Sequence, residues 1–464
     1  MNKKQLTVAE SACIITGYGI GGGVMAMPYL AQKNGVVVSL LILAAAFGAS
    51  FVLHVMIAEL AVKSGGGSQI IEVFSRYLFQ GKYQKVLTAG FFVIMALVLF
   101  TNLAAYISGA AEIISELLGI SLWLSRLLFY AAAASVVLFG LKAVGISEKL
   151  AVTVIFLLVG VLAFFSLAHV NNPLPVRAGR VTEGLAYFGM AMFAFSAFFS
   201  VPQAVAGLGG DGKKVKKAVF LGLMNNFVLI VVISVCALLS SVQVTEVAMI
   251  GWSQGIGSWA EIVGSLFTIL AMLTTYWSIS LALSDIVEEQ LKLSRRICWV
   301  IATLPSLLMT FAGLGGFMEF MRLAGGLIAI LIALLVVPAY RKASREPGNS
   351  LLGKWGGAGM QIMIMLAYFL MAVGNVVLNR VASPIYPNTI EGVLAQKNQF
   401  STYQSGSLAK RTPNESSVIA AKLVLDGGVV EETRGALYFD SSVGSWASRN
   451  RNCIAVIGGH KFYD

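Results

Sequence analysis

Charged side chains are scarce in this chain. Lys, Arg, Asp and Glu make up 12% of its 464 residues, whereas hydrophobic residues make up 57%. Typical soluble domains carry about twice that charged fraction, so the composition excludes a soluble protein of this length. Roughly 20 consecutive apolar residues span a bilayer, and the chain contains many such runs. The composition therefore predicts a polytopic protein of the cell membrane, in contact with the lipid bilayer.

Histidine and cysteine are rare as well, with three and four copies. The cysteines follow no metal-ligand spacing, and His460 has no partner at ligand distance along the chain. We expect no metal site, no catalytic residue and no cofactor. The net charge of +11 does not indicate a nucleic-acid partner, because the basic residues stand in short loops between apolar runs.

Eleven apolar segments are long enough, alone or with a short break, to cross a membrane. The composition turns polar near residue 379, so the chain divides into a membrane part, 1–370, whose last span runs on to about 378, and a tail, 371–464. The expected spans are 10–32, 36–62, 86–115, 122–141, 149–170, 183–207, 217–241, 257–284, 296–314, 318–340 and 358–378.

Basic residues are distributed unevenly between the two sides of these spans. One side holds most of them, in residues 3–4 and in the loops 63–85, 142–149, 213–217, 292–296 and 341–354. Cytoplasmic loops carry the excess of Lys and Arg in membrane proteins. This pattern predicts a cytoplasmic N-terminus, and the odd number of spans then places the tail outside the cytoplasm.

The first span is interrupted by five glycines within seven positions: Gly17, Gly19, Gly21, Gly22 and Gly23. Each glycine costs about 1 kcal/mol inside a helix, so a simple membrane crossing gains nothing from them. Broken helices at membrane depth are typical of substrate sites in secondary transporters. The alternative is close helix packing through small residues. A dinucleotide fingerprint is excluded, because that motif needs a preceding strand in a soluble unit.

The sixth span repeats the irregularity near Phe195, Ser196 and Pro202. Proline removes a helix hydrogen bond, and neighbouring serines can satisfy the freed backbone groups. Two broken spans that lie five apart predict two inverted repeats of five spans each.

The run Gly17-Tyr-Gly-Ile-Gly-Gly-Gly-Val-Met-Ala-Met-Pro28-Tyr29 resembles the first helix of amino-acid permeases, in particular the aromatic and auxiliary amino-acid branch of the amino acid–polyamine–organocation superfamily. The Phe-Ala-Phe-Ser run from Phe193 is similar to that family's second broken helix. The resemblance implies an all-α, five-plus-five inverted-repeat transporter fold with an eleventh helix. It also implies ion- or proton-coupled uptake, as by a symporter, of amino acids, with aromatic or other neutral ones expected.

We expect the free N–H groups at Gly19 to Gly23 to hold the substrate carboxylate, because helix N-termini attract anions. The carbonyl groups at the Phe195–Ser196 break would hold the ammonium group. Aromatic side chains would form the side-chain pocket, with Phe193, Phe198 and Phe199 as candidates. Tyr106 resembles a carboxylate contact of the wider fold, and its alternative is a helix–helix hydrogen bond. Asn225 and Asn226 are expected to form interhelical bonds.

Thr274, Thr275 and Ser278 cluster on neighbouring turns of the eighth span. In the wider fold, hydroxyl groups at this place bind Na⁺ together with carbonyl groups of the first helix, and oxygen suits a hard cation. The alternative is that they bond to their own preceding turn. A proton-coupled protein would use a buried titratable group instead, and His54 and Glu59 are the candidates.

The tail resembles the SleB-type cell wall hydrolases of spore cortex lysis. The similarity runs from Val373-Gly-Asn-Val-Val-Leu-Asn379-Arg380 through Pro387-Asn388-Thr389-Ile390 to Ile457-Gly-Gly-His460. That family's catalytic glutamate precedes the Asn-Arg pair, but no acidic residue occurs here between Glu346 and Glu391. Without a carboxylic acid, a glycosidase has no proton donor. We expect a truncated, inactive α+β fragment whose contact with peptidoglycan is doubtful.

Two other functions remain open at this stage. The protein could be a membrane-anchored cell wall hydrolase, in which the spans serve only as an anchor. It could also be a germinant-type receptor of the same superfamily, which binds amino acids without transporting them. The cost of two broken helices argues against a simple anchor.

Overall fold

The structure is a computed structural model that describes residues 5–244, 248–313, 332, 334–347 and 350–381, together with short strands between residues 417 and 462. The chain forms two compact units, Met1–Ala382 and Ser383–Asp464.

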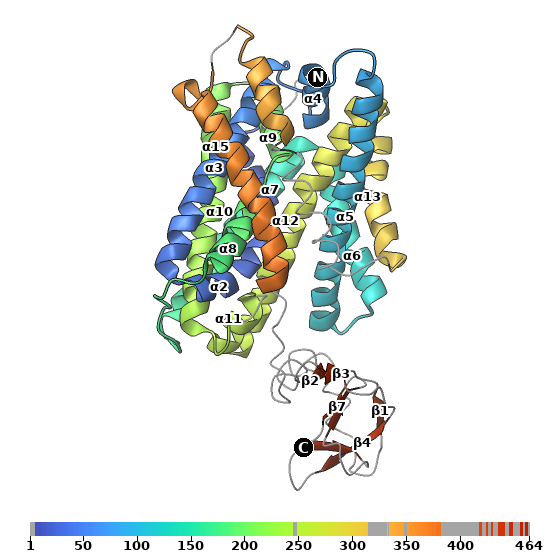
Figure 1. Cartoon of the computed structure of the whole chain (residues 1–464). Helices are drawn as coiled ribbons and strands as arrows, with labels where there is room; N and C mark the ends of the chain where they lie inside the picture. The colour runs from blue at the N-terminus through green and yellow to red at the C-terminus, as the bar shows by residue number, and fades with distance from the viewer. Residues whose placement is uncertain are drawn as a thin grey trace. The chain divides into compact units, whose positions relative to one another are not determined.

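Helices make up the first unit (Figure 1). Their bounds are α1 Val8–Ile20, α2 Gly22–Asn34, α3 Val36–Lys63, α4 Ile70–Tyr77, α5 Gln84–Leu118, α6 Leu122–Leu138, α7 Leu141–Ser166, α8 Val181–Ala194, α9 Ser200–Gly207, α10 Gly212–Ser240, α11 Ala248–Ile256, α12 Ser258–Leu291, α13 Arg295–Phe311, the 3₁₀ turn η1 Gly353–Gly356 and α15 Ala358–Val381.

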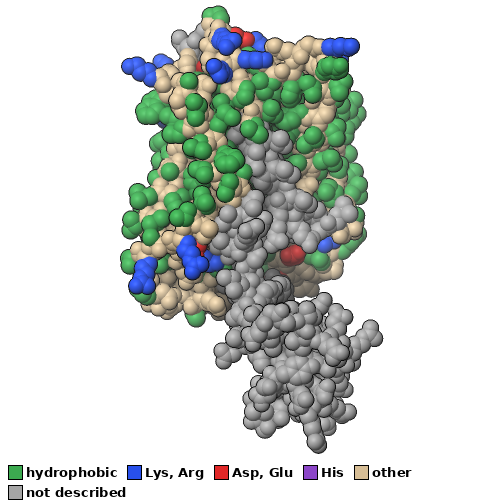
Figure 2. All heavy atoms as spheres, in the orientation of Figure 1, with side chains coloured by type: hydrophobic (Ala, Val, Ile, Leu, Met, Phe, Trp, Pro, Cys, Tyr) green, Lys and Arg blue, Asp and Glu red, His purple; other side chains and the backbone are tan. Residues whose placement is uncertain are grey.

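Six of the described helices are long and apolar enough to cross a membrane, and α1 with α2 forms a seventh span with a bend of 59°. The shorter helices α6, α8 with α9, and α13 lie at the fourth, sixth and ninth expected spans. Most of the tenth, 318–340, lies outside the described residues. Large apolar side chains such as Leu41, Leu97 and Leu157 face outward. Figure 2 shows such side chains over the middle of one face, with Lys and Arg gathered towards its two ends.

The fifth span begins earlier than the sequence indicates. Helix α7 starts at Leu141 rather than at residue 149, because its basic N-terminal turn has a buried partner. The ammonium group of Lys142 donates hydrogen bonds to both carboxylate oxygens of Glu10 on α1, at 2.7 and 2.6 Å. Ion pairing with Lys142 lowers the cost of burying the Glu10 carboxylate. As a result, Glu148 lies inside a packed helix and not in a loop.

Helix α15 packs closely against α8 where two glycines meet. A β-carbon on Gly374 would overlap the Leu185 carbonyl oxygen and would lie 3.1 Å from the α-carbon of Gly189. Small residues let membrane helices approach this closely. The crossing of Gly374 and Gly189 therefore holds the last described membrane helix to α8, one half of the sixth span.

The described residues of the second unit are short antiparallel strands. Strand β4, Gly435–Asp440, lies between β1, Ser417–Ile419, and β5, Ser445–Ser448. Phe439 stands opposite Trp446 in the β4–β5 ladder. Two hairpins complete these strands: β2, Val424–Leu425, with β3, Gly428–Val429, and β6, Ala455–Ile457, with β7, His460–Phe462. The strands fit the β part of the expected α+β fragment.

The glycine crossing leads to a prediction about stability. Gly374→Leu inserts a side chain where backbone atoms already touch, so we expect the folded state to lose about 1–3 kcal/mol through overpacking. Gly359→Leu is the matched control, because that position of the same helix has open space around it. Apparent melting temperatures of the full chain in detergent would measure both. Equal melting temperatures for the two variants would contradict the packing role of Gly374.

Candidate functional site

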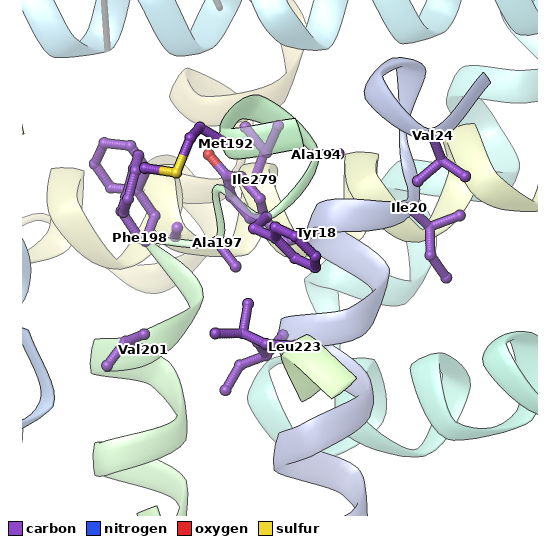
Figure 3. Close-up of a cluster of buried hydrophobic side chains, with 14 of the residues drawn as sticks. Tyr18, Ile20, Val24, Met192, Ala194, Ala197, Phe198, Val201, Leu223 and Ile279 are labelled. Carbon is purple, nitrogen blue, oxygen red and sulfur yellow. The ribbon is translucent and has the colours of Figure 1, made fainter. Parts of the chain in front are cut away.

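The two helix interruptions lie side by side in the interior. Helix α1 ends at Ile20, and α2 starts after Gly21; α8 ends at Ala194, and α9 starts at Ser200. The rings of Tyr18 and Phe199 stack with their centroids 6.5 Å apart. Figure 3 shows Tyr18 beside Ala194, Met192 and Ile279 in one buried cluster. The two breaks expected near Gly21 and near Phe195 are therefore present, and they face each other.

Glycines at the first break allow predicted site residues to approach the backbone. A β-carbon on Gly21 would lie 2.6 Å from the Tyr106 hydroxyl and 3.0 Å from the Thr275 hydroxyl. One on Gly23 would lie 3.0 Å from the α-carbon of Ala194 and 3.1 Å from the Phe193 ring. Helices α5, α8 and α12 thus converge on this turn. The surroundings of Gly22 are not among the parts that the structure describes.

Two further glycines face residues that the sequence did not single out as site residues. A β-carbon on Gly17 would overlap the carboxyl group of Glu148 on α7. One on Gly19 would overlap the amide of Asn226 on α10. Both side chains are fully buried, and neither the Asn226 amide atoms nor Glu148 Oε2 has a hydrogen-bond partner among the described residues. Buried polar atoms of this kind require an explanation, and a ligand is one.

His54 organises the second break. The backbone N–H of Ala197 donates to its Nε2 at 2.9 Å, and its Nδ1 lies 2.6 Å from the Ser50 carbonyl oxygen. Because an amide can only donate, Nε2 is unprotonated, and Nδ1 carries the hydrogen that it donates to Ser50. The ring also stacks on Phe198 at 5.1 Å. His54 thus supplies a hydrogen-bond acceptor for a backbone N–H that the break leaves free. In this role its ring is neutral, because Nε2 has to stay unprotonated.

The other residues expected at the second break contact different parts of the structure: some face α1 across the break, and others pack against α3 or their own helix. Phe199 contacts Tyr18 across the break. Phe195 packs edge-on against Phe47 of α3, with centroids 5.9 Å apart. The Ser196 hydroxyl donates to the Met192 carbonyl one turn back, at 2.9 Å. Pro202 lies in the first turn of α9, where a missing N–H costs no helix hydrogen bond.

Hydroxyl groups of α12 meet carbonyl groups of α1. Thr275 and Thr274 donate to the Gly17 carbonyl oxygen at 2.9 and 3.4 Å, and Ser278 donates to that of Ile14 at 3.1 Å. Both threonine hydroxyls also lie 2.9 Å from the Ala271 carbonyl in their own helix. The three predicted residues of α12 therefore lie together against α1, and they make both kinds of contact that the sequence left open.

Glu148 joins this hydroxyl cluster. Its Oε1 lies 2.6 Å from the Ser278 hydroxyl, and the Gln203 amide of α9 donates to the Ser278 carbonyl at 3.4 Å. Glu148 was not among the residues selected from the sequence, because the expected fifth span begins at residue 149. A usable signal was its spacing, since Val144, Glu148, Val152 and Ile155 fall on one helix face.

The other polar residues considered from the sequence have structural partners. Asn225 donates to the Thr16 hydroxyl at 3.1 Å, which is the interhelical bond that we expected. Glu59 accepts hydrogen bonds from Ser350 and from the backbone of Leu351, at 3.0 and 2.8 Å, and pairs with Lys63 at 3.4 Å. Glu59 therefore holds the segment before α15 in place.

Comparison with known proteins decides the family. The model of the tryptophan/tyrosine permease family matches residues 4–375. The chain belongs to the tryptophan/tyrosine permease family. A second family model, described as cell wall hydrolase, matches residues 370–463, so the two matches share residues 370–375 of α15. Both resemblances seen in the sequence are confirmed.

Two transporters are similar over most of the chain. Glutamine transporter 2 of Aliivibrio fischeri is 24% identical over 358 residues, which cover 72% of this chain and 90% of that protein. Tyrosine-specific transport system 1 of Haemophilus influenzae is 23% identical over 386 residues, covering 77% and 93%. This membrane part is accordingly a secondary transporter of the multi-pass type.

Solved structures confirm the fold. The nucleobase-cation-symport-1 transporter Mhp1, with bromovinylhydantoin bound, has a TM-score of 0.57 at 13% identity and covers 83% of this chain and 94% of its own. MhsT in complex with L-phenylalanine has a TM-score of 0.56 at 17% identity and covers 81% and 100%. The predicted five-plus-five transporter fold is therefore confirmed.

The tail has a relative of its own. The spore cortex-lytic enzyme of Bacillus cereus is 38% identical over 96 residues, which cover 20% of this chain. The match spans about a third (35%) of that enzyme.

The role of His54 at the second break can be tested by substitution. His54→Leu leaves the buried Ala197 N–H without an acceptor, so we expect a loss of about 1–3 kcal/mol of stability. His169→Leu is the matched control, because this exposed histidine bonds only to its own turn in the described structure. Melting temperatures in detergent would report both. A His54→Leu protein as stable as the control would remove His54 from this role.

Proposed function

We propose that the protein is an ion-coupled transporter that moves aromatic or other neutral amino acids across the cell membrane by alternating access. The single observation that carries this proposal is the pair of facing breaks lined by Gly17, Gly19, Gly21 and Gly23. Relatives named for tyrosine and glutamine, and a structural neighbour with bound L-phenylalanine, support a neutral substrate.

Each end of an amino acid has suitable partners at the breaks. Helix α2 starts at Gly22 without a side-chain cap, so its first N–H groups are available for a carboxylate. Tyr106 lies beside this turn and would add a hydroxyl donor. The ammonium group would lie against the carbonyl groups of the second break, at Phe195 and Ser196. Tyr18, Phe193 and Phe199 supply the aromatic surface for a bulky side chain.

The cluster on α12 supports coupling to an ion. Thr274, Thr275 and Ser278 present oxygen atoms next to the carbonyl groups of the broken helix α1. A cation or a proton bound there would stabilise one position of α1 relative to α12. Binding that favours one conformation shifts its population, which links the ion to the substrate turn at Gly21.

The orientation in the membrane is proposed from the basic residues. Lys63, Lys142 and the run from Lys213 to Lys217 belong to the side that we assign to the cytoplasm, by the positive-inside rule. The N-terminus is then cytoplasmic. The tail after Val381 is extracytoplasmic, although most of its residues lie outside the described structure.

We infer that the tail is not an active hydrolase. The hydrolase match begins at residue 370, within the helix that packs against α8, and no acidic residue occurs between Glu346 and Glu391. A glycoside hydrolase needs a carboxylic acid to protonate the leaving oxygen. The alternative function, a membrane-anchored cell wall hydrolase, is therefore the less favoured one.

The transport proposal is tested by uptake into proteoliposomes that hold the full chain. We expect counterflow of radiolabelled L-tyrosine, L-tryptophan or L-glutamine. Gly21→Ala should reduce it about tenfold or more, because a methyl group there presses on Tyr106 and Thr275 and loses at least about 1.4 kcal/mol of binding.

Gly48→Ala serves as the control, since nothing lies within 4 Å of a β-carbon at that position of α3. Binding of the labelled amino acids without counterflow would favour the germinant-type receptor. If the wild type shows neither binding nor counterflow, the proposed function is overturned.

The inactivity of the tail has a separate test. We expect the purified full chain to release no soluble fragments from isolated spore cortex or vegetative peptidoglycan, because the acidic residue expected before Asn379-Arg380 as proton donor is absent. Release of reducing sugars or muropeptides, measured against a heat-treated sample, is the readout. Fragment release above that background would restore the hydrolase alternative.

A further inference from the structure

We propose that the coupling ion is a proton and that Glu148 carries it. This inference rests on the proposed transport function and names the ion and the residue. It concerns a side chain that the sequence pattern did not single out.

Glu148 lies where three elements meet. It projects from α7 onto Gly17 of α1 and onto Ser278 of α12, and no part of the residue is exposed. Ionisable residues inside a membrane protein are costly to keep, and they mark ion or proton pathways. Among the described residues, Glu148 forms no ion pair, whereas Glu10 pairs with Lys142 and Glu59 pairs with Lys63.

The hydrogen bonds around Ser278 favour the neutral acid. The single proton of the Ser278 hydroxyl has two neighbours, the Ile14 carbonyl at 3.1 Å and Glu148 Oε1 at 2.6 Å. The carbonyl can only accept. If Glu148 is protonated, its O–H donates to Ser278, and Ser278 donates to Ile14, so both contacts are satisfied at once.

The second oxygen of Glu148 leads to the same conclusion. Oε2 is buried against Gly17 and has no hydrogen-bond partner among the described residues. An unpartnered charged carboxylate oxygen costs far more than the carbonyl oxygen of a neutral acid. A deprotonated Glu148 would also repel the carbonyl groups of Ile14 and Gly17. Loss of the proton therefore favours movement of α1 away from α7.

The charged groups on neighbouring elements do not compensate Glu148. Helix α1 brings the Cys13 thiol, which interacts electrostatically with Glu148, and Glu10, which Lys142 neutralises. Lys149, next in α7, is exposed. The sequences of α9 and α11 contain no titratable residue. The other packed helices carry further titratable residues: Tyr18 of α1, Arg126 and Tyr130 of α6, Lys213, Lys214, Lys216, Lys217 and Cys236 of α10, and Glu261, Tyr276, Asp285, Glu288 and Glu289 of α12.

The other buried candidates are already engaged. His54 accepts from Ala197 through the nitrogen that a second proton would need. Glu59 accepts bonds from Ser350 and Leu351. The Thr275 and Ser278 hydroxyl groups donate to α1 carbonyl groups but keep lone pairs that a sodium ion could use. The choice of a proton therefore rests on Glu148 itself, whose contact with Ser278 and whose unpartnered Oε2 suit the neutral acid.

The test uses proteoliposomes that hold the full chain in sodium-free buffers, with radiolabelled L-tyrosine, L-tryptophan and L-glutamine as probes. An inward gradient of about one pH unit should support an about tenfold accumulation if one proton moves with each substrate. For Glu148→Gln, which keeps the shape but cannot release a proton, we expect accumulation to fall to equilibration while counterflow continues. Lys149→Gln, the exposed neighbour, should behave as the wild type.

Several outcomes separate this inference from the proposed function. In a separate set of vesicles, wild-type accumulation under an inward sodium gradient with no pH gradient would contradict proton coupling. Accumulation by Glu148→Gln under the pH gradient would contradict the role of Glu148. Absence of wild-type counterflow would instead overturn the transport proposal itself. If Glu148→Gln fails to fold in detergent, a pH dye trapped in wild-type vesicles still decides whether a proton moves with the substrate. Substrate addition should acidify the interior, and unchanged dye signal during uptake would overturn the proposal.

Discussion

The bonds from α12 hydroxyl groups to α1 carbonyl groups are the interactions on which the membrane unit depends. A helix that stops at membrane depth leaves carbonyl groups without partners, and lipid offers none. Thr275 supplies one at Gly17, and Ser278 adds a bond to the Ile14 carbonyl about one turn earlier. Since each hydroxyl group has one proton and several possible acceptors, these bonds can be exchanged without breaking the fold. The break in α1 is thereby both stable and able to change.

The second break is stabilised in a different way. Its backbone N–H at Ala197 bonds to the His54 ring, which is itself fixed by Ser50 and by stacking on Phe198. An aromatic ring held on three sides cannot exchange partners as a hydroxyl group can. The structure thus combines an adaptable break in α1 with a rigid one between α8 and α9. This division suits a protein in which one half-helix moves against a fixed neighbour.

Much of this arrangement could be predicted from the sequence because it depends on local chemistry. Five glycines within seven residues have no purpose in a plain span, and the hydroxyl groups of Thr274, Thr275 and Ser278 recur at helical spacing. Glu148 could not be placed, because the start of α7 depends on the pairing of Lys142 with Glu10, residues 132 positions apart. The role of His54 was equally hidden, since its partner Ala197 is 143 positions away. Contacts at such separations are set by packing and leave no periodic signal.

The crossing of α15 with α8 bears on how two unrelated sequences can share one helix. Residues 370–375 match both families, yet the packing there depends on the absence of side chains at Gly374 and Gly189. A membrane helix that packs through glycine requires little of its neighbours except apolar character and length. The position that restricts the sequence of α15 here is Gly374, which lies within the six residues that both family models match. One glycine therefore serves the packing of the transporter at the point where the hydrolase-like sequence begins.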